Sequence, residues 1–210
     1  MKIAYKLTDS EMKTYKGFQW ELGKWYETTG EGGLCSPGWL HFYSNSLLGL
    51  FMNPIYGNIL NPRLFRAEVE GKFLDNNGLK CGYSRARLIE ELPVPQISPV
   101  QRVRFAILCA KEVYKRKEWN KWANNWLSGK DRTKKSAAIA ESAVIAVESA
   151  VQITVQSTAQ SAFCAVQSAA SIASAFCTGK SAKNAAKSAF FATKSKKIDL
   201  IKIAQKAMKE

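Results

Sequence analysis

Glycine and proline are confined almost entirely to the first 95 residues of the chain. Nearly all of the 13 glycines and all but one of the six prolines lie there, between short aromatic and β-branched runs. This distribution is typical of short strands joined by turns, because glycine and proline interrupt regular secondary structure. The remainder of the chain is free to form long helices.

Several segments of this first region carry strand patterns. Phe18–Leu22 alternates and is followed by Gly23-Lys24, which predicts a hairpin with Trp25-Tyr26. Ser46–Phe51 is a candidate short helix that ends at Asn53-Pro54. The further strand candidates are Trp39–Tyr43, Leu64–Gly71 and Arg85–Leu92.

A stiff connector, Pro93-Val94-Pro95-Gln96, ends the strand-like region, since proline fixes φ and removes a hydrogen-bond donor. Directly after it, Ser98 is a candidate N-cap, Pro99 suits the first helical position and Gln101 completes a capping box. We therefore predict an α+β protein: a β-rich module over residues 1–95 and an all-α, Ala/Ser-rich helical bundle over residues 98–210.

The helical half begins with aromatic residues and continues with small ones. Trp119, Trp122 and Trp126 lie three and four apart, which predicts one stripe of indoles in the core of a short helix that ends at Gly129. From Asp131 to Lys194 alanine and serine dominate. Ser-Ala pairs recur at 142, 149, 161, 168, 174, 181 and 188, often seven apart. Such spacing puts small residues on one helix face, where helices can approach closely.

The stretch from Ser149 to Thr178 contains no charged residue, so it is a candidate membrane span. Four glutamines and many serines and threonines oppose this alternative, because polar groups are costly in hydrocarbon. We expect buried bundle helices here, and self-association through the Ala/Ser faces is a further expectation. The first six residues lack the apolar core of a signal peptide, which favours the cytosol.

Charge and cysteine content restrict the chemistry. The 31 Lys and Arg against 17 Asp and Glu give a formal charge of +14, which favours polyanionic partners. The cysteines form an odd set of five without a CxxC pair, and His41 is the single histidine. We therefore predict no metal site, no disulfide framework and no cofactor. Gly30–Gly33 lacks the Lys-Ser/Thr of a phosphate loop and is predicted to be a hairpin loop.

A cluster of basic residues covers the first two predicted helices and the link that follows. Such a patch could bind phosphate groups, and this binding would depend strongly on salt. The alternative interpretation is that these residues form an ordinary solvated face of a basic protein. The chain has no groove-reading motif, which argues against sequence-specific DNA recognition. The cluster consists of Arg102, Arg104, Lys111, Lys115, Arg116, Lys117, Lys121, Lys130, Arg132, Lys134 and Lys135.

The segments Cys109–Val113 and Trp122–Gly129, followed by the alanine-rich run from Ala137, resemble a family of phage and bacterial proteins classed as immunity proteins. In that family a C-A-x-x-V helix precedes an A-x-x-W-x-x-G helix and alanine-dense helices. The region with Tyr15–Gln19 and Leu34–Gly38 looks like a module of phage and prophage proteins. The resemblance implies a mobile-element setting and a helical C-terminal fold, and it carries no catalytic residues across.

An enzymatic alternative comes from a second resemblance. Gly38–Asn45, a helix and the strand from Leu64 look like the strand–helix–strand order of ADP-ribosyltransferases. In that reading Tyr43 would support a nicotinamide and Glu90 or Glu91 would orient the ribose. The early-strand histidine or arginine of such folds has no counterpart. His41 as a general base lacks a neighbouring nucleophile, so a structural role is favoured.

The leading hypothesis is therefore a non-enzymatic phage or prophage accessory protein of the bacterial cytoplasm. It would bind an acidic host protein or nucleic acid through the basic helical face, in an anti-defence or immunity-type role. The alternative is an ADP-ribosyltransferase-like N-terminal module with a helical targeting domain.

Overall fold

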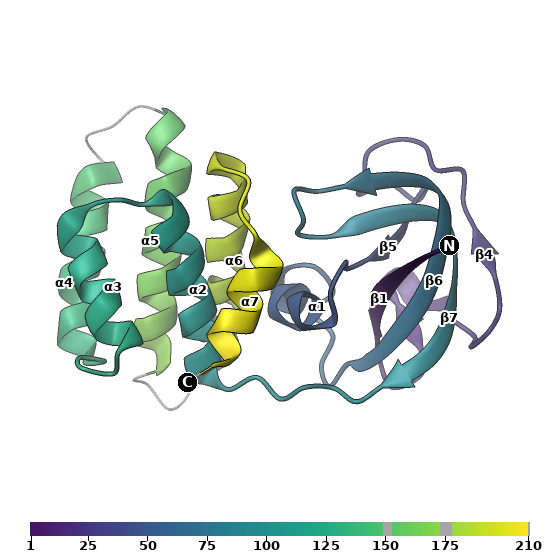
Figure 1. The fold of residues 1–210 in the computed structure, drawn as a ribbon, viewed down its shortest axis with the longest axis horizontal. Coiled ribbons are helices and arrows are strands. Elements are labelled where there is room, and N and C mark those ends of the chain that lie inside the picture. The colour runs from purple at the N-terminus through teal and green to yellow at the C-terminus, as the bar shows by residue number, and fades with distance from the viewer. Residues whose placement is uncertain (149–152, 173–177, 210) are drawn as a thin grey trace. The chain divides into compact units, whose positions relative to one another are not determined.

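The chain has an α+β fold, as the sequence predicts. The structure is a computed structural model that describes residues 1–148, 153–172 and 178–209. The chain separates into two compact units, Met1–Gln96 and Ile97–Glu210, which we call the strand unit and the helical unit (Figure 1). The division falls directly after the proline-containing connector. Each unit is described by itself.

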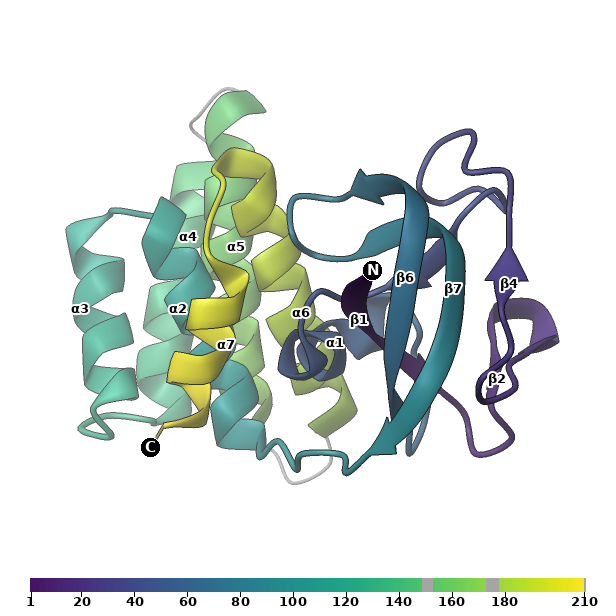
Figure 2. The ribbon, with the colours of Figure 1, turned by 45° about the vertical axis from the view of Figure 1, so that its right-hand side comes forward.

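The strand unit is built around a long antiparallel hairpin of β6 and β7, and β1 pairs with the outer side of β6. The short strands β4 and β5 pair with different parts of β7, and β2 pairs with β3 in a separate small sheet (Figure 2). The elements are β1 (Lys2–Thr8), β2 (Lys13–Thr14), β3 (Phe18–Gln19), β4 (Tyr26–Glu27), β5 (Leu40–Phe42), α1 (Ser46–Met52), β6 (Arg63–Asp75) and β7 (Cys81–Leu92), with 3-10 turns at Tyr15–Gly17 and Asn53–Ile55.

The sheet closes on itself through β5. Just beyond β5, Tyr43 exchanges two backbone hydrogen bonds of 2.8 and 2.9 Å with Tyr5 of β1, while β5 itself pairs with β7. Side chains that alternate inward from these strands form an aromatic-rich core, in which Trp20 and Phe42 are almost fully buried. The closure places the inward-facing Lys6 of β1 inside this core.

Two expectations for this unit differ from the structure, and one strand was missed. The predicted hairpin of Phe18–Leu22 with Trp25-Tyr26 is wrong, because β3 pairs with β2 and β4 pairs with β7. The Gly30–Gly33 segment is not a hairpin loop, since the strands that it joins, β4 and β5, both pair with β7. The edge strand β1 was not predicted. The strands predicted at 39–43, 64–71 and 85–92 and the helix at 46–51 are confirmed with shifted ends.

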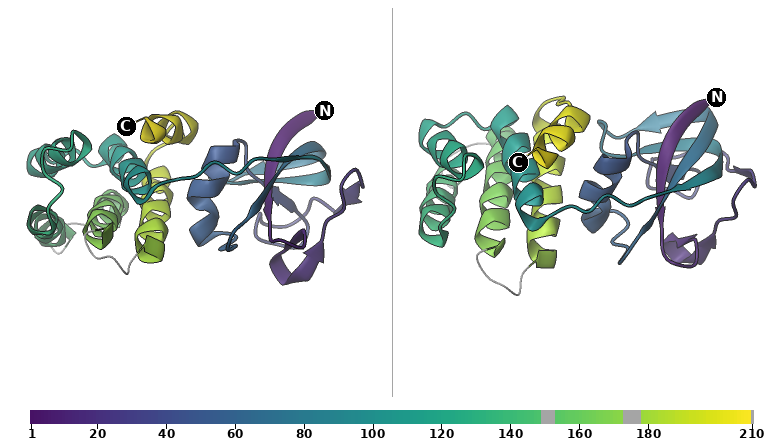
Figure 3. Two further views of the ribbon diagram at one scale, coloured as in Figure 1. Left: turned by 90° about the horizontal axis from the view of Figure 1, so that it is seen from below. Right: turned by 60° about the horizontal axis from the view of Figure 1, so that its bottom comes forward.

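The helical unit is an antiparallel bundle in two layers. Helices α3, α2 and α7 form one layer and α4, α5 and α6 form the other (Figure 3). The tryptophan stripe is confirmed as core, with Trp119, Trp122 and Trp126 at most 7% exposed. The helices are α2 (Pro99–Val113), α3 (Lys117–Leu127), α4 (Lys134–Glu148), α5 (Ile153–Ile172), α6 (Thr178–Ser195) and α7 (Leu200–Met208).

Helix α2 starts with the predicted capping box. The Ser98 hydroxyl accepts from the Gln101 backbone N–H at 3.1 Å, and the Gln101 side chain accepts from the Ser98 N–H at 2.8 Å. We expect Ser98→Ala to lower the unfolding free energy of the helical unit by about 1 kcal/mol, because one helical N–H loses its partner. Urea unfolding followed by circular dichroism at 222 nm measures this change.

Ser142→Ala on α4 is the matched control for that experiment. The exposed Ser142 hydroxyl donates to the Ala138 carbonyl of its own helix at 3.0 Å, so its removal should leave the unfolding free energy nearly unchanged. Equal losses in both variants would contradict a specific role for the Ser98 cap.

Serine and alanine form the contact between the antiparallel helices α5 and α6. Ser161 donates to the Ser188 carbonyl at 2.9 Å, and Ser168 donates to the Ser181 carbonyl at 2.9 Å. All four serines are fully buried. The seven-residue spacing thus returns hydroxyls to one close-packed face within the chain, and these positions are not exposed for self-association.

Part of the charge-free stretch, residues 149–152 and 173–177, lies outside the described residues. Among the helices that the structure describes, none combines the length and apolarity needed to cross a membrane.

Candidate functional site

The two units differ sharply in charge. Residues 97–210 contain 20 Lys and Arg and 7 Asp and Glu, a formal charge of +13, whereas residues 1–96 contain 11 and 10, a formal charge of +1. The positive field of the protein therefore originates in the helical unit. Long-range attraction of an acidic group would therefore act mainly through that unit.

In the strand unit the charges are paired across strands. Arg63 contacts Glu91, Arg66 contacts Glu90, and Arg87 contacts Glu68, at 2.5 to 2.7 Å. In contrast, none of the ion pairs that the structure describes within 1–148, 153–172 and 178–209 involves the exposed residues Lys115, Arg116, Lys117, Lys121, Lys130, Lys134 or Lys135. These cations are open to an external anion.

Three arginines of the predicted basic cluster are half-buried or bound to backbone carbonyls of the helical unit. Arg104 donates to the Leu127 carbonyl at 3.0 Å, and Arg132 donates to the Trp126 carbonyl at 3.0 Å while covering the Trp126 ring at 4.7 Å. Both cations therefore stabilise the C-terminus of α3, where carbonyls lack helical partners. Arg102 is half-buried, and burial lowers the pKa of its guanidinium.

Lysines from α2, α7 and the α2–α3 link gather near one another. Lys111 donates to the Asn124 side chain on α3, and Lys115 donates to the Lys111 carbonyl. Burial, and then the neighbouring Lys206 and Lys115, lower the pKa of Lys111. An anion bound there would relieve the mutual repulsion of these ammonium groups. Lys206 of α7 thus joins the basic surface, although it was not among the residues of the predicted basic cluster.

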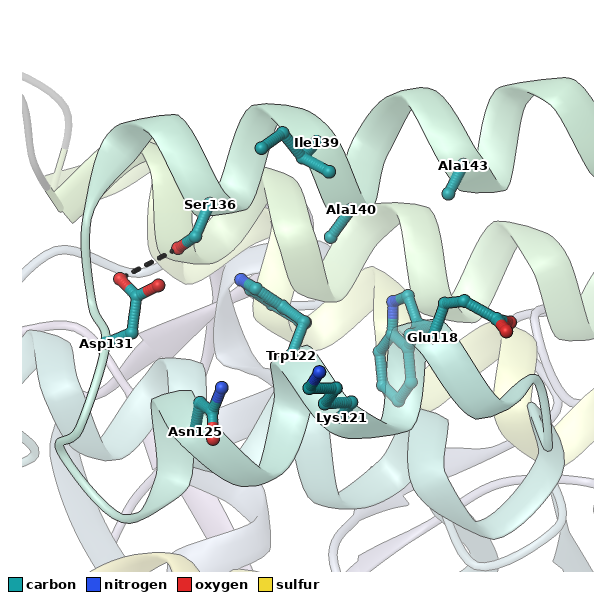
Figure 4. Close-up of a pocket in the computed structure, with 10 residues that line it drawn as sticks. Glu118, Lys121, Trp122, Asn125, Asp131, Ser136, Ile139, Ala140 and Ala143 are labelled. Atoms are coloured by element: carbon teal, nitrogen blue, oxygen red, sulfur yellow. Dashed lines mark hydrogen bonds between the residues drawn. The ribbon is translucent and has the colours of Figure 1, made fainter.

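A pocket lies between α3 and α4, beside the exposed lysines of α3. The pocket is open to solvent on one side and has a volume of about 190 Å3. Figure 4 shows Trp122 extending from α3 toward α4, with Lys121 and Asn125 on the same helix and Asp131 in the link. The lining residues are Glu118, Trp119, Lys121, Trp122, Asn125, Asp131, Ser136, Ile139, Ala140 and Ala143.

Two donors in this pocket have no acceptor. The indole Nε1 atoms of Trp119 and Trp122 are covered from solvent and have no hydrogen-bond partner among the described residues. A buried N–H without a partner costs about 1 to 3 kcal/mol, so a ligand acceptor at this position would be favourable. By contrast, the carboxylate of Asp131 is already occupied, since it accepts from the hydroxyls of Thr133 and Ser136 at 2.8 and 3.0 Å.

The structure does not bring the residues of the ADP-ribosyltransferase alternative together. His41 pairs with Gly82 near the start of β7, whereas Glu90 lies eight residues further along that strand, roughly 26 Å at strand rise. Glu90 and Glu91 are held by arginines of β6. Tyr43 is buried, and burial raises the pKa of its hydroxyl.

Lys6 is an unusual residue of the strand unit. Its side chain is buried, with the residue 8% exposed, and its ammonium donates to the His41 carbonyl at 2.6 Å. The rings of Trp20 and Phe42 lie 4.9 and 5.0 Å from Nζ. No carboxylate pairs with it among the described residues, and burial lowers the pKa of Lys6 to about 7.

The environment of Lys6 also affects its neighbours. Burial raises the pKa of the Cys81 thiol to about 12. Burial, and to a lesser extent Lys6 and Lys80, lower the pKa of His41. These groups are neutral at pH 7, so the interior contains titratable side chains in their uncharged forms. A predicted strand over residues 2–8 would have placed Lys6 in the core, because Lys6 points to the same inward face as Ala4 and Thr8.

Residues 2–99 match the model of a family described as a domain of unknown function, DUF7666. The match covers the strand unit and ends at the first residue of α2. No curated protein and no solved structure matches the chain. The comparisons therefore outline the strand unit as a domain and assign no activity to it.

Proposed function

We propose that the chain is an accessory binding protein whose helical unit binds an acidic partner. The observation that carries the proposal is the segregation of charge: +13 in the helical unit against +1 in the strand unit. Exposed lysines of α3 and of the α3–α4 link, which have no carboxylate partner among the described residues, support it. Attraction of this kind acts over about 8 Å at physiological salt and speeds association with polyanions.

The partner is an acidic host protein or a nucleic acid bound without sequence specificity. The setting we propose is the cytoplasm of a bacterial host, with an anti-defence or immunity-type role, and it rests on the resemblance of the helical half to immunity proteins of phage and bacteria. Lysines on several helices provide a broad charged surface rather than a reading helix, which suits phosphates or carboxylates more than base edges.

The test is affinity capture of the tagged full-length chain from bacterial lysate, at low and moderate salt, with and without nuclease. We expect acidic material to be retained at low salt and released as salt rises, because bound counterions are exchanged. A stoichiometric acidic protein that survives nuclease identifies a protein partner, and nuclease-sensitive material identifies nucleic acid. Capture that is indifferent to salt, or absent, would contradict the proposal.

A further inference from the structure

We propose that the pocket between α3 and α4 binds a nucleotide, with the base inside the pocket and the phosphate among the lysines outside it. The inference deepens the proposed binding function and rests on it, because it assigns one ligand class to the same basic surface. It stands on three features of the described residues: the pocket's walls, its unpartnered donors and the charges around its mouth.

The walls suit one compact, flat ring system. The volume of about 190 Å3 is below the roughly 300 Å3 at which pockets for drug-sized ligands begin, which suits a single ring system inside the pocket. Indoles of α3 form one side, and Ile139, Ala140 and Ala143 of α4 form the other (Figure 4). Ile139 is 65% exposed, so apolar surface continues to the mouth.

The polar groups match the edge of a base. The two indole N–H groups of Trp119 and Trp122 lack acceptors, and a ring nitrogen or carbonyl oxygen that reaches them would supply one. Asn125 offers both a donor and an acceptor, and Glu118 can accept from an amino group. A hydrocarbon ligand would leave both indoles unpaired. A simple anion would use the lysines and leave the apolar walls empty.

The charges beside the pocket match a phosphate. Lys121 lines the pocket, and the exposed Lys117 lies one helical turn before it on α3. The exposed Lys130, Lys134 and Lys135 belong to the link and the start of α4, next to Asp131 and Ser136 of the lining. A base bound in the pocket would therefore have its phosphate close to the ammonium groups of these lysines. The same chemistry is available from a free mononucleotide or from an unstacked base in a single strand.

The experiment is a titration of the 15N-labelled full chain, with the indole N–H signals as the readout. AMP and UMP are the probes, and inorganic phosphate is the control for charge alone. We expect both nucleotides to shift the Trp119 and Trp122 signals, because their N–H groups gain acceptors. Trp20 and Trp39 already donate to Thr14 and Gly32, at 3.1 and 3.0 Å, and serve as internal controls that do not shift.

Two substitutions on α4 test the location. Ala143 lines the pocket, so Ala143→Leu fills it and should weaken nucleotide binding at least about 10-fold. Ala138 is exposed on the same helix and does not line the pocket, so Ala138→Leu should leave the affinity unchanged. Circular dichroism of both variants verifies that α4 is retained.

Single-stranded and duplex oligonucleotides of the same length then distinguish the sources of the base. Tighter indole-shifting binding by the single strand than by UMP points to single-stranded nucleic acid, and the reverse points to a free nucleotide. The inference is overturned if neither nucleotide shifts the two indole signals, if inorganic phosphate shifts them equally, or if Ala143→Leu binds as wild type. Retention on a polyanion column without indole shifts would overturn the pocket assignment alone and leave the proposed function standing.

Discussion

Lys6→Met is expected to stabilise the strand unit by about 2 to 4 kcal/mol at pH 7. The folded pKa of Lys6, about 7, lies below the ordinary value of 10.5, so the unfolded chain binds the proton more tightly. One pKa unit corresponds to about 1.4 kcal/mol, and the lost hydrogen bond to the His41 carbonyl offsets part of the gain. Methionine has a similar length and carries no charge that burial would penalise.

The stabilisation by Lys6→Met should depend on pH. Between pH 7 and 10.5 the unfolded state holds the Lys6 proton that the folded state releases, so the Lys6 penalty shrinks as pH rises. The stability advantage of Lys6→Met should therefore be largest at and below pH 7 and decline at pH 8 and 9. Each variant is compared with wild type at the same pH, so titratable groups that do not interact with Lys6 contribute equally to both.

Urea unfolding monitored by tryptophan fluorescence at pH 7, 8 and 9 provides the measurement. Lys2→Met is the matched control, since Lys2 lies on the same strand with its side chain exposed, and we expect it to change little at any pH. Destabilisation by Lys6→Met at every pH would show that the ammonium group is required in the core, which contradicts the account of a penalised charge.

Ser188→Leu is expected to lower the unfolding free energy of the helical unit by about 3 kcal/mol or more. The Ser188 hydroxyl lies at the contact of α2, α5 and α6, 3.0 Å from the Ala106 carbonyl and 2.8 Å from the Ser161 carbonyl. The residue is fully buried, so a leucine side chain must push helices apart. Overpacking and the loss of a buried hydrogen bond both act in the same direction.

Two controls separate size from hydrogen bonding. Ser188→Ala removes the hydroxyl without adding volume and should cost only about 1 kcal/mol. Ser195→Leu makes the same change at the exposed end of α6 and should be nearly neutral. Thermal and urea unfolding followed at 222 nm report all three variants. A tolerated Ser188→Leu would contradict close helix packing through small residues.

Local sequence signals predict the elements that they fully specify. The capping box at Ser98, the tryptophan stripe of α3 and the alternating strand from Leu64 each depend on neighbouring residues alone, and the structure confirms them. Strand pairing depends on the whole sheet. The turn signal at Gly23 suggested that Phe18–Leu22 pairs with Trp25-Tyr26. In the structure β3 pairs with β2 instead, and β4 and β5 both pair with β7.

The candidate site was predictable only in part. Charge identifies exposed lysines such as Lys117 and Lys134, but sequence cannot tell them from Arg104 and Arg132, whose geometry commits them to the end of α3. The tryptophans were rightly assigned to the core. That two of their N–H groups lack acceptors depends on the packing of α3 against α4, which no local pattern encodes.

The central claim, that the helical unit supplies the protein's affinity for polyanions, is tested by the salt concentration at which the chain elutes from a heparin column. A variant with Lys130, Lys134 and Lys135 changed to glutamate reverses three exposed charges of the helical unit. The matched control changes Lys2, Lys16 and Lys24, three exposed lysines of the strand unit, to glutamate. Both variants have the same net charge.

We predict that the helical-unit variant elutes at clearly lower salt than wild type and that the strand-unit control elutes close to wild type, because in the proposed function the helical unit contacts the polyanion. Equal shifts in the two variants would show that net charge alone determines retention. That result, or failure of the wild-type chain to bind heparin at low salt, would contradict the account.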